Sequence, residues 1–158
     1  MEFRMARAED LDGIIALVQE RIDWMDEVGL EQWNKTDYFG RFPREYFEAN
    51  LPWFVVAEEN GVLAAAAAFY EEDDYWPREG EPAVYIHHLA SSLACKGAGR
   101  ALMEYADVYA RERGIHLLRL DSAVDNLVLE RFYTDLGYRA VGTCQGGLYR
   151  GITREKRI

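Results

Sequence analysis

The sequence predicts a single α/β domain in which strands and helices alternate on one mixed sheet. Three observations support this prediction: short runs of apolar residues of the β type, apolar residues at helical spacing between them, and turn signals that separate the two patterns. With 158 residues, of which 49% are hydrophobic and 13% aromatic, the chain is long enough for one substantial core. It has no linker-like composition and no internal repeat. We therefore expect residues 1–158 to form one domain.

The N-terminal part is expected to begin with a strand that leads into a helix. Residues 1–5 alternate as a short strand would, and apolar residues then recur at helical spacing over 11–25. Gly29 stands where it would end this helix. Pro43 precedes a second short helix, predicted over 44–49.

A hairpin is predicted next. Residues 53–57 and 62–70 flank the dipeptide 60–61, Asn-Gly, which strongly favours a tight hairpin turn. The alanine run 64–68 could be helical on propensity alone, but its place after the turn and its apolar context favour a buried strand. An acidic, aromatic and proline-containing loop over 71–80 follows.

The second half of the chain continues the alternation of strands and helices, with glycines at the helix ends. The expected elements are a strand over 83–90, a glycine turn and a main helix closed by Gly114, a strand over 117–120, a helix over 127–136 ended by Gly137, and a final hairpin of 138–143 with 148–152.

Composition limits the classes of partner and compartment. The net charge of −10 disfavours nonspecific binding to nucleic acid or anionic membranes and weakly favours a cationic partner such as an amine. No apolar run approaches membrane-spanning length, and residues 1–10 lack the pattern of a signal peptide, so a cytoplasmic protein is expected. Cys95 and Cys144 are too few for a disulfide framework and lack the spacing of zinc ligands. We expect free thiols and no metal.

Residues 84–105 carry the most informative pattern, a β-type run that passes through a glycine turn into an amphipathic helix. Gly97 and Gly99 would let the backbone approach a ligand closely, and the first amides of the helix would lack intrahelical acceptors. Lys96 and Arg100 add positive charge. This combination predicts a site for phosphate oxygens at a helix N-terminus, although a plain tight helix entry has the same glycine spacing.

Two common phosphate loops do not fit these residues. A P-loop requires Lys followed by Ser or Thr after its last glycine, whereas Gly99 is followed by Arg100 and Ala101. A dinucleotide-binding fingerprint requires a third small residue where this chain has Leu102.

The loop instead resembles the pyrophosphate-binding loop of the GNAT N-acetyltransferase superfamily, Gln/Arg-x-x-Gly-x-Gly/Ala, which holds acetyl-coenzyme A. A second motif, Asp125-Asn126 followed by residues 130–138 (ERFYTDLGY), resembles the superfamily's downstream signature, an Asn leading into a helix that ends Phe-Tyr-x-x-Leu-Gly-Phe/Tyr. The order and separation of the two motifs also fit. The resemblance implies a GNAT-like fold with a mixed, mostly antiparallel central sheet flanked by helices, and an acetyl-coenzyme A-dependent transfer of an acetyl group to a primary amine.

The resemblance also implies which residues contact the cofactor. The oxyanion donor would be a backbone amide near Leu89 or Ala90. The chain departs from the family pattern at Ala94, where Gln or Arg is preferred, and at Cys95, where Gly is common. The connection between the strand and the glycine turn is also about two residues shorter than usual. The implied cofactor-binding residues are Leu89, Ala90, Cys95, Lys96, Gly97, Ala98, Gly99, Arg100, Asn126 and Tyr133.

Two residues are assigned to catalysis. Tyr133 occupies the family position of the acid that protonates the leaving thiolate, although its helical stripe is equally that of a core tyrosine. The family usually presents its base from the strand that carries His87 and His88. Adjacent strand residues point to opposite faces, so only one histidine would face the acyl group, and we favour His87. Asn126 would contact the pantetheine arm, cap its helix, or do both.

The acceptor would lie between the first helical region and the loops, where aromatic residues accompany carboxylates and suit an ammonium group. The candidates are Trp24, Trp33, Tyr75 and Trp76, with Asp23, Asp26, Glu27, Glu72 and Asp73 nearby.

A small-molecule or peptide amine is expected to attack directly in a ternary complex, and a homodimer is possible. The alternative is a non-catalytic acyl-coenzyme A sensor, which would need neither Tyr133 nor a histidine base. We also expect Cys95, beside Lys96 and a helix N-terminus, to have a lowered pKa and raised reactivity.

Overall fold

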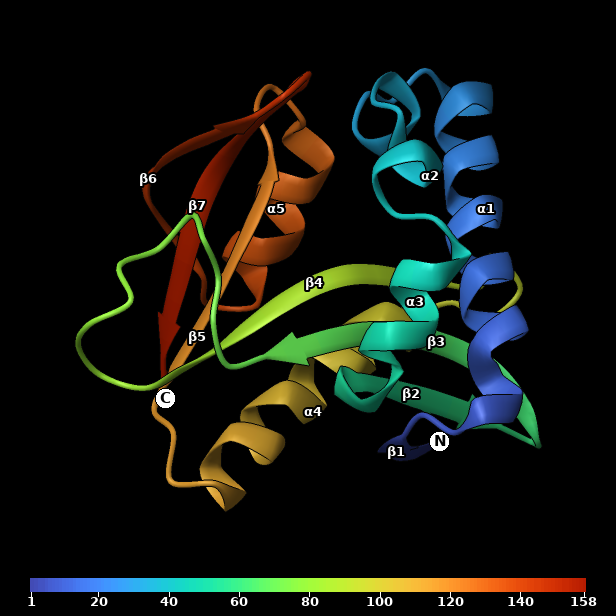
Figure 1. Ribbon diagram of the computed structural model, residues 1–158, viewed down its shortest axis with the longest axis horizontal. Coiled ribbons are helices and arrows are strands. Elements are labelled where there is room, and N and C mark those ends of the chain that lie inside the picture. The colour runs from blue at the N-terminus through green and yellow to red at the C-terminus, as the bar shows by residue number, and fades with distance from the viewer.

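The computed structural model describes residues 1–158 and contains one seven-stranded sheet in the order β1-β2-β3-β4-β5-β7-β6. All neighbouring strands are antiparallel except β4 and β5, which are parallel. This is the predicted mixed, mostly antiparallel sheet (Figure 1). The strands are β1 Glu2–Met5, β2 Phe54–Glu59, β3 Val62–Tyr70, β4 Ala83–Ser91, β5 Leu117–Ala123, β6 Arg139–Gly146 and β7 Tyr149–Arg157.

Helices cover both faces of this sheet. In Figure 1, α1, α2 and α3 lie on one side of the β2–β4 region, α4 lies on the other, and α5 lies beside β5 and β7. None of the helices combines the length and the apolar character needed to cross a membrane. The helices are α1 Leu11–Val28, α2 Tyr38–Arg41, α3 Arg44–Asn50, α4 Ala98–Glu112 and α5 Leu127–Asp135, with short 3-10 helices at Ala8–Asp10, Trp33–Lys35 and Leu51–Trp53.

Strand β2 separates two apolar cores by the alternation of its side chains. Val55 packs in the core beneath α4 and α5, whereas Phe54 and Val56 pack in the core beneath α1 and α3. All three side chains are at most 1% exposed. Because both faces of the strand are buried, the sequence reads as a continuous apolar run.

Strands β4 and β5 pair over only three positions, from Ala83 opposite Leu117 to Tyr85 opposite Arg119. Beyond these pairs β4 continues beside β3, and β5 continues beside β7. The two strands therefore diverge toward their carboxyl ends, as Figure 1 shows. The sheet opens there, while β4 stays paired with β3 and β5 stays paired with β7.

The first hairpin confirms the prediction from Asn-Gly. Asn60 and Gly61 have φ of 52° and 78°, the left-handed values that a tight hairpin turn of this type requires. The alanine run lies within β3 and is almost fully buried, so sheet pairing overrides its helical propensity.

The last strand, β7, is longer than predicted, because charged side chains extend it beyond its apolar residues. Glu155 on β7 accepts from Arg119 of β5 at 2.8 Å, and Lys156 donates to Asp107 of α4 at 2.6 Å. Apolar periodicity alone ends β7 at residue 152, whereas the paired charges extend it to Arg157. Helix α2, a single turn capped by Asp37, was not predicted.

Phe47 provides a test of the core beneath α3. Its side chain is fully buried and packs against Phe54, Tyr38 and His88. Phe47→Ala should lower the free energy of unfolding by about 3 to 5 kcal/mol, because it removes buried surface and leaves a cavity. Urea denaturation measures the change. Val108→Ala, at a position 43% exposed on α4, is the control, and an equal effect of the two substitutions would contradict this description of the core.

Candidate active site

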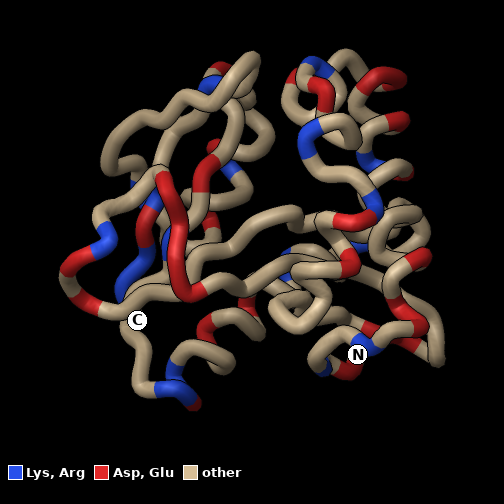
Figure 2. Tube along the Cα trace, viewed as in Figure 1, with Lys and Arg blue, Asp and Glu red and all other residues tan.

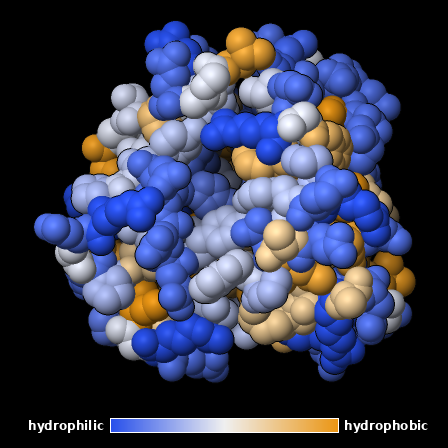
Figure 3. All heavy atoms as spheres, in the orientation of Figure 1, coloured by the Kyte–Doolittle hydropathy of each residue, from blue (hydrophilic) through white to orange (hydrophobic).

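A cavity of about 750 Å³ lies where β4 and β5 diverge. Its walls come from α1, the segment around α2, the loop between β3 and β4, strands β4, β5 and β7, the start of α4, and α5. Figure 3 shows the face of the molecule hollowed near its centre. The cavity therefore collects residues from nearly the whole length of the chain.

The glycine turn forms one end of this cavity. Gly97 precedes α4 with φ of 86°, a left-handed conformation that favours glycine, and a Cβ built there would meet no atom within 4 Å. Gly97, Gly99 and Arg100 line the cavity. No side chain caps α4. The Ala98 amide donates to the Cys95 carbonyl at 3.2 Å, whereas the Gly99 and Arg100 amides have no intrahelical acceptor and can donate to a ligand. The Arg100 guanidinium lies over the Phe132 ring, 5.7 Å from its centroid.

Five residues predicted to bind the cofactor do not line the cavity: Ala90, Cys95, Lys96, Ala98 and Asn126. Ala98 is buried in the core, and Lys96 is exposed. The Cys95 thiol donates to the Glu59 carboxylate at 2.8 Å. This contact raises the pKa of Cys95, so the predicted lowering was wrong. The reason is a carboxylate 36 residues away in the chain, which disfavours the thiolate and which local sequence could not reveal.

Tyr133 belongs to the core, as its helical stripe predicted, and it also lines the cavity, while its catalytic role stays a prediction. The residue is 7% exposed. Burial raises the pKa of its hydroxyl well above the usual value, with Asp121 adding to the effect. The hydroxyl makes no hydrogen bond to the protein. It is held protonated and has its hydrogen-bonding capacity free.

Asn126 caps α5. Its side-chain oxygen accepts from the Leu129 amide at 3.1 Å, and the preceding Asp125 turns the chain with φ of 65°. The structure therefore shows the capping role. Asn126 does not line the cavity, and its contact with a ligand stays a prediction.

A β-bulge in β4 corrects the expectation that His87 and His88 face opposite ways. Ala66 pairs with Ala90 and Ala68 pairs with His87, so β4 has one residue more than β3 between these pairs. His88 occupies the bulge with φ of 57°. The bulge breaks strict alternation, and both histidines line the cavity.

His88 is fully engaged by tyrosines. Its Nδ1 bonds the Tyr38 hydroxyl at 2.5 Å, and its Nε2 bonds the Tyr46 hydroxyl at 2.9 Å. Tyr46 also bonds the Tyr70 hydroxyl at 2.7 Å. Burial, and then His87 and Arg41, lower the pKa of His88 well below its ordinary value. A neutral imidazole donates from one nitrogen and accepts at the other, so the two tyrosine hydroxyls satisfy it and hold the bulge in place.

His87 forms an ion pair with Asp73, through Nε2 and a carboxylate oxygen. Burial alone would lower the pKa of His87, but the hydrogen bond and charge of Asp73 outweigh it and raise that pKa. The same contact outweighs the effect of burial on Asp73 and lowers the pKa of its carboxyl. Asp73 belongs to the acidic run 71–74 in the loop between β3 and β4, which Figure 2 shows crossing in front of the sheet.

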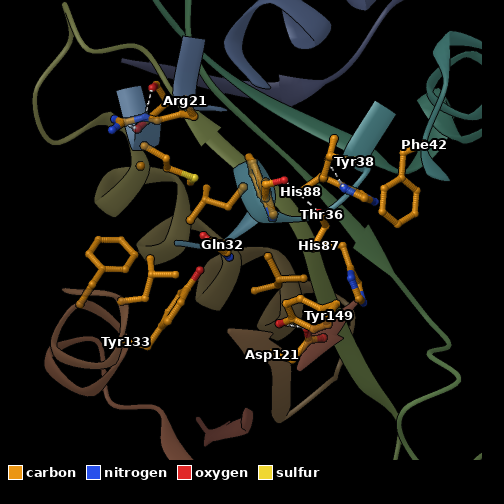
Figure 4. A pocket seen from close by; sticks show the side chains of 18 of the residues that line it. Arg21, Gln32, Thr36, Tyr38, Phe42, His87, His88, Asp121, Tyr133 and Tyr149 are labelled. Atoms are coloured by element: carbon orange, nitrogen blue, oxygen red, sulfur yellow. Dashed lines mark hydrogen bonds between the residues drawn. The ribbon is translucent and has the colours of Figure 1, made fainter. Parts of the chain in front are cut away.

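Asp121 and Tyr149 were missed by the sequence analysis. The Tyr149 hydroxyl donates to Asp121 Oδ2 at 2.6 Å, while Oδ1 is buried with no partner. Burial raises the pKa of Asp121. Asp121 lies one residue beyond the predicted end of β5 at Leu120. Only a longer strand, with its side chains alternating past Leu120, would have indicated that Asp121 belongs to the site. Figure 4 shows Asp121 and Tyr149 near His87, with Tyr133 on the opposite side of the cavity.

Asp73, His87 and Asp121 each offer a ligand atom, and these atoms lie within 4.8 Å of one another. We call these residues, with Tyr149, the Asp-His-Asp cluster. Two carboxylates and an imidazole are donors of the kind that can hold a divalent cation. They can equally hold a proton or an organic cation.

Three of the four aromatic residues proposed for the acceptor, Trp24, Trp33 and Tyr75, line the cavity. Trp76 does not: its ring packs on Tyr85 and lies beneath the Arg119 guanidinium, 4.6 Å from the ring centroid. That part of the prediction is corrected, because the loop turns Trp76 onto a separate small core. Of the acidic candidates, Glu72 and Asp73 line the cavity, whereas Asp23, Asp26 and Glu27 do not.

Two arginines of the cavity were also missed. Arg21 of α1 donates to the Ser91 carbonyl at 2.6 Å and to the Ser91 hydroxyl at 2.7 Å, which ties α1 to the end of β4. Arg41 reaches the Gly146 carbonyl at 3.5 Å and the Tyr75 hydroxyl at 3.4 Å. Arg41 thus connects the α2 segment with the β3–β4 loop and the β6–β7 hairpin.

Comparison with known proteins gives a consistent result. The model of the acetyltransferase (GNAT) family matches residues 16–138. The chain is 26% identical over 161 residues to the uncharacterized N-acetyltransferase YesJ of Bacillus subtilis (strain 168), covering 89% of this chain and 83% of that protein.

Solved structures share the fold. A GNAT-family acetyltransferase from Listeria monocytogenes 4b F2365 has a TM-score of 0.78 at 21% identity, covering 99% of this chain and 94% of that one. The PaiA N-acetyltransferase from Thermoplasma acidophilum, in complex with coenzyme A, has a TM-score of 0.74 at 18% identity, covering 99% and 98%.

The ion pair of Asp73 and His87 can be tested by NMR titration of the His87 imidazole. Asp73→Asn should lower the pKa of His87, because it removes the charge that offsets burial. Asp74→Asn is the matched control, since this neighbouring carboxylate is 89% exposed and pairs with Arg78 instead. An unchanged His87 pKa in Asp73→Asn would contradict the assignment. The ion pair also contributes to the free energy of unfolding. Because the pKa of His87 is higher in the folded than in the unfolded protein, this contribution is fully present below the unfolded pKa of about 6.5 and is lost as pH rises through the folded pKa.

Proposed function

The chain belongs to the acetyltransferase (GNAT) family, is an N-acetyltransferase and uses acetyl-coenzyme A; on this premise we propose that it transfers the acetyl group to a primary amine by direct attack in a ternary complex. One observation carries the proposal. A single cavity joins the glycine turn, the Tyr133 hydroxyl and the His87 imidazole, so the cofactor, the acid and the base meet in one space.

The residues at the glycine turn fit the pyrophosphate of the cofactor. Gly97 presents open space where a side chain would stand, and Gly99 lies close to Ser91, with only 3.1 Å from a built Cβ to the Ser91 hydroxyl. The uncapped start of α4 supplies amide donors and the positive end of the helix dipole. Arg100 adds positive charge at this end of the cavity. When bound, acetyl-coenzyme A supplies the acetyl group as a thioester.

The β4 bulge supplies a donor for the thioester oxygen. His88 and Leu89 have no opposite residue in the register with β3, and Leu89 lines the cavity. Backbone amides outside the ladder are available to a ligand. We assign the oxyanion contact to the backbone near Leu89 and Ala90, where a preorganised donor is most effective.

His87 is the base in this proposal. Its Nε2 is directed to Asp73, and its Nδ1 makes no hydrogen bond to the protein, so the neutral tautomer that donates to Asp73 presents a lone pair at Nδ1. Nδ1 accepts one proton from the amine, and Asp73 stabilises the resulting imidazolium. Asp73 acts through His87 and is a positioning residue.

Tyr133 is the acid in this proposal and gives its proton to the leaving sulfur. A bond forms between the amine nitrogen and the acyl carbon, the bond from that carbon to sulfur breaks, and the sulfur takes the phenolic proton. The raised pKa of Tyr133 keeps that proton in place until a thiolate develops. Solvent then exchanges the proton held on His87 for the one lost from Tyr133.

An amine panel tests the function, with release of free thiol from acetyl-coenzyme A as the readout. The wild-type protein should turn over at least one class of primary amine, and Gly97→Asp should abolish both cofactor binding and turnover by placing a carboxylate in the pyrophosphate space. Gly61→Asp is the matched control, because Gly61 also has a positive φ and open surroundings but lies in the first hairpin. Calorimetric binding of acetyl-coenzyme A without turnover of any amine would instead favour a sensor.

Tyr133→Phe should lower kcat ten-fold or more, since general acid catalysis contributes about 10² to 10⁴, while the affinity for acetyl-coenzyme A is nearly unchanged. Steady-state kinetics and calorimetry measure the two quantities. The substitution keeps the ring in the core, so the melting temperature serves as the control for folding. Wild-type turnover in this variant would leave Tyr133 with a structural role only.

A further inference from the structure

The end of the cavity opposite Tyr133 contains a carboxylate whose hydrogen bonds are only half satisfied. Asp121 Oδ2 accepts from the Tyr149 hydroxyl at 2.6 Å, while Oδ1 is buried and has no donor. A buried acceptor without a donor is costly, more so when it is charged. The protein supplies no further hydrogen to this oxygen, so a ligand that carries N–H donors would satisfy it.

The charge at this end of the cavity favours a cation. The ligand atoms of Asp73, His87 and Asp121 lie within 4.8 Å of one another. With both carboxylates ionised, the Asp-His-Asp cluster has one net negative charge when the imidazole is protonated and two when it is neutral. The nearby cation is Arg41, which reaches to the Gly146 carbonyl and the Tyr75 hydroxyl rather than to a carboxylate.

The walls around the cluster are aromatic. Tyr46, Tyr70, Tyr75 and Tyr149 line the cavity beside it, and aromatic rings attract an organic ammonium more than they attract a hydrated metal ion. Figure 4 shows Tyr149 and Asp121 joined by their hydrogen bond and placed beside His87. An ammonium bound to Asp121 would therefore lie next to the base.

We propose that Asp121 and Tyr149 bind the ammonium group of the acceptor, and that the acceptor is an organic amine without a carboxylate. The inference rests on the proposed function, whose acceptor it specifies. Asp121 holds the charged amine. His87 takes one of its protons and releases it to solvent before attack, so that Nδ1 is again free to accept the second proton, which leaves the nitrogen as the amide forms. A carboxylate on the same molecule would be repelled by Asp73 and Asp121, so amino acids should be poorer ligands than the amines that share their side chains.

Calorimetry on the protein saturated with coenzyme A tests this directly, because no acetyl group is present and binding is separated from turnover. The probes are two matched pairs that differ by one carboxylate: 1,4-diaminobutane with ornithine, and 2-phenylethylamine with phenylalanine. We expect at least one amine to bind more tightly than its amino acid. Asp121→Asn should weaken that binding ten-fold or more, as expected for a hydrogen bond to a charged group, and Tyr149→Phe should weaken it by a smaller factor.

Glu71→Gln is the control for charge, because Glu71 lies in the same loop, is exposed and does not line the cavity. Its affinity for the amine should equal that of the wild type. The melting temperature and the affinity for coenzyme A report whether Asp121→Asn is folded. If it is not, Tyr149→Phe, which removes a single hydroxyl, decides the question by its loss of affinity.

Several results would overturn the inference: equal amine affinity in the wild type and in folded Asp121→Asn, tighter binding of either amino acid than of its amine, or no binding of either amine. The alternative ligand of the cluster is a divalent metal ion, which a titration of chelator-treated protein with MnCl₂ tests. Tight Mn²⁺ binding that displaces the amine would make the cluster a metal site. Failure of the proposed function looks different: amines would bind at Asp121, but none would be acetylated.

Discussion

The early end of the pairing between β4 and β5 is the constraint on which the site depends. After Tyr85 and Arg119 the two strands share no further pairs, and each keeps only its outer neighbour. A sheet that continued across this point would bury the backbone groups in its ladder and leave no cavity. Because it does not, the strands separate enough to admit a ligand, and backbone donors of β4 remain outside the ladder.

The β4 bulge adds a second constraint, held by a buried polar network. A non-glycine residue in the left-handed region costs about 1 to 2 kcal/mol, and His88 adopts it. Its two hydrogen bonds to Tyr38 and Tyr46, at about 1 kcal/mol each, offset that cost. The tyrosines come from the α2 and α3 region, so the helical layer on one face of the sheet fixes the backbone conformation at the proposed reacting centre.

The parts of the site that the sequence predicted are those encoded by neighbouring residues. Gly97 and Gly99 could be identified because the turn and the helix that follows are contiguous, and Tyr133 because its motif spans one short helix. The same locality made the hairpin at Asn60 and the capping role of Asn126 predictable. Each of these features depends on backbone geometry within a few residues.

The parts that sequence reasoning missed depend on contacts between distant segments. Asp121 meets Asp73 only because β5 and the β3–β4 loop converge at the cavity, and His88 shares the cavity with His87 only because of a register shift against β3. The pKa of Cys95 was predicted in the wrong direction for the same reason, since Glu59 comes from the first hairpin. Periodicity carries no information about such encounters.

The contacts of Arg41 join three segments, α2, the β3–β4 loop and the β6–β7 hairpin, that are far apart in the chain. The end of the cavity that they enclose is therefore walled partly by connections, whereas Asp121, Tyr149 and Tyr133 belong to regular elements. Connections tolerate insertion and exchange far better than packed elements do. Replacement of residues 71–82 would therefore change the walls around the proposed acceptor and the Asp73 partner of His87, while Asp121 and Tyr149 on the strands and the start of α4 would stay in place.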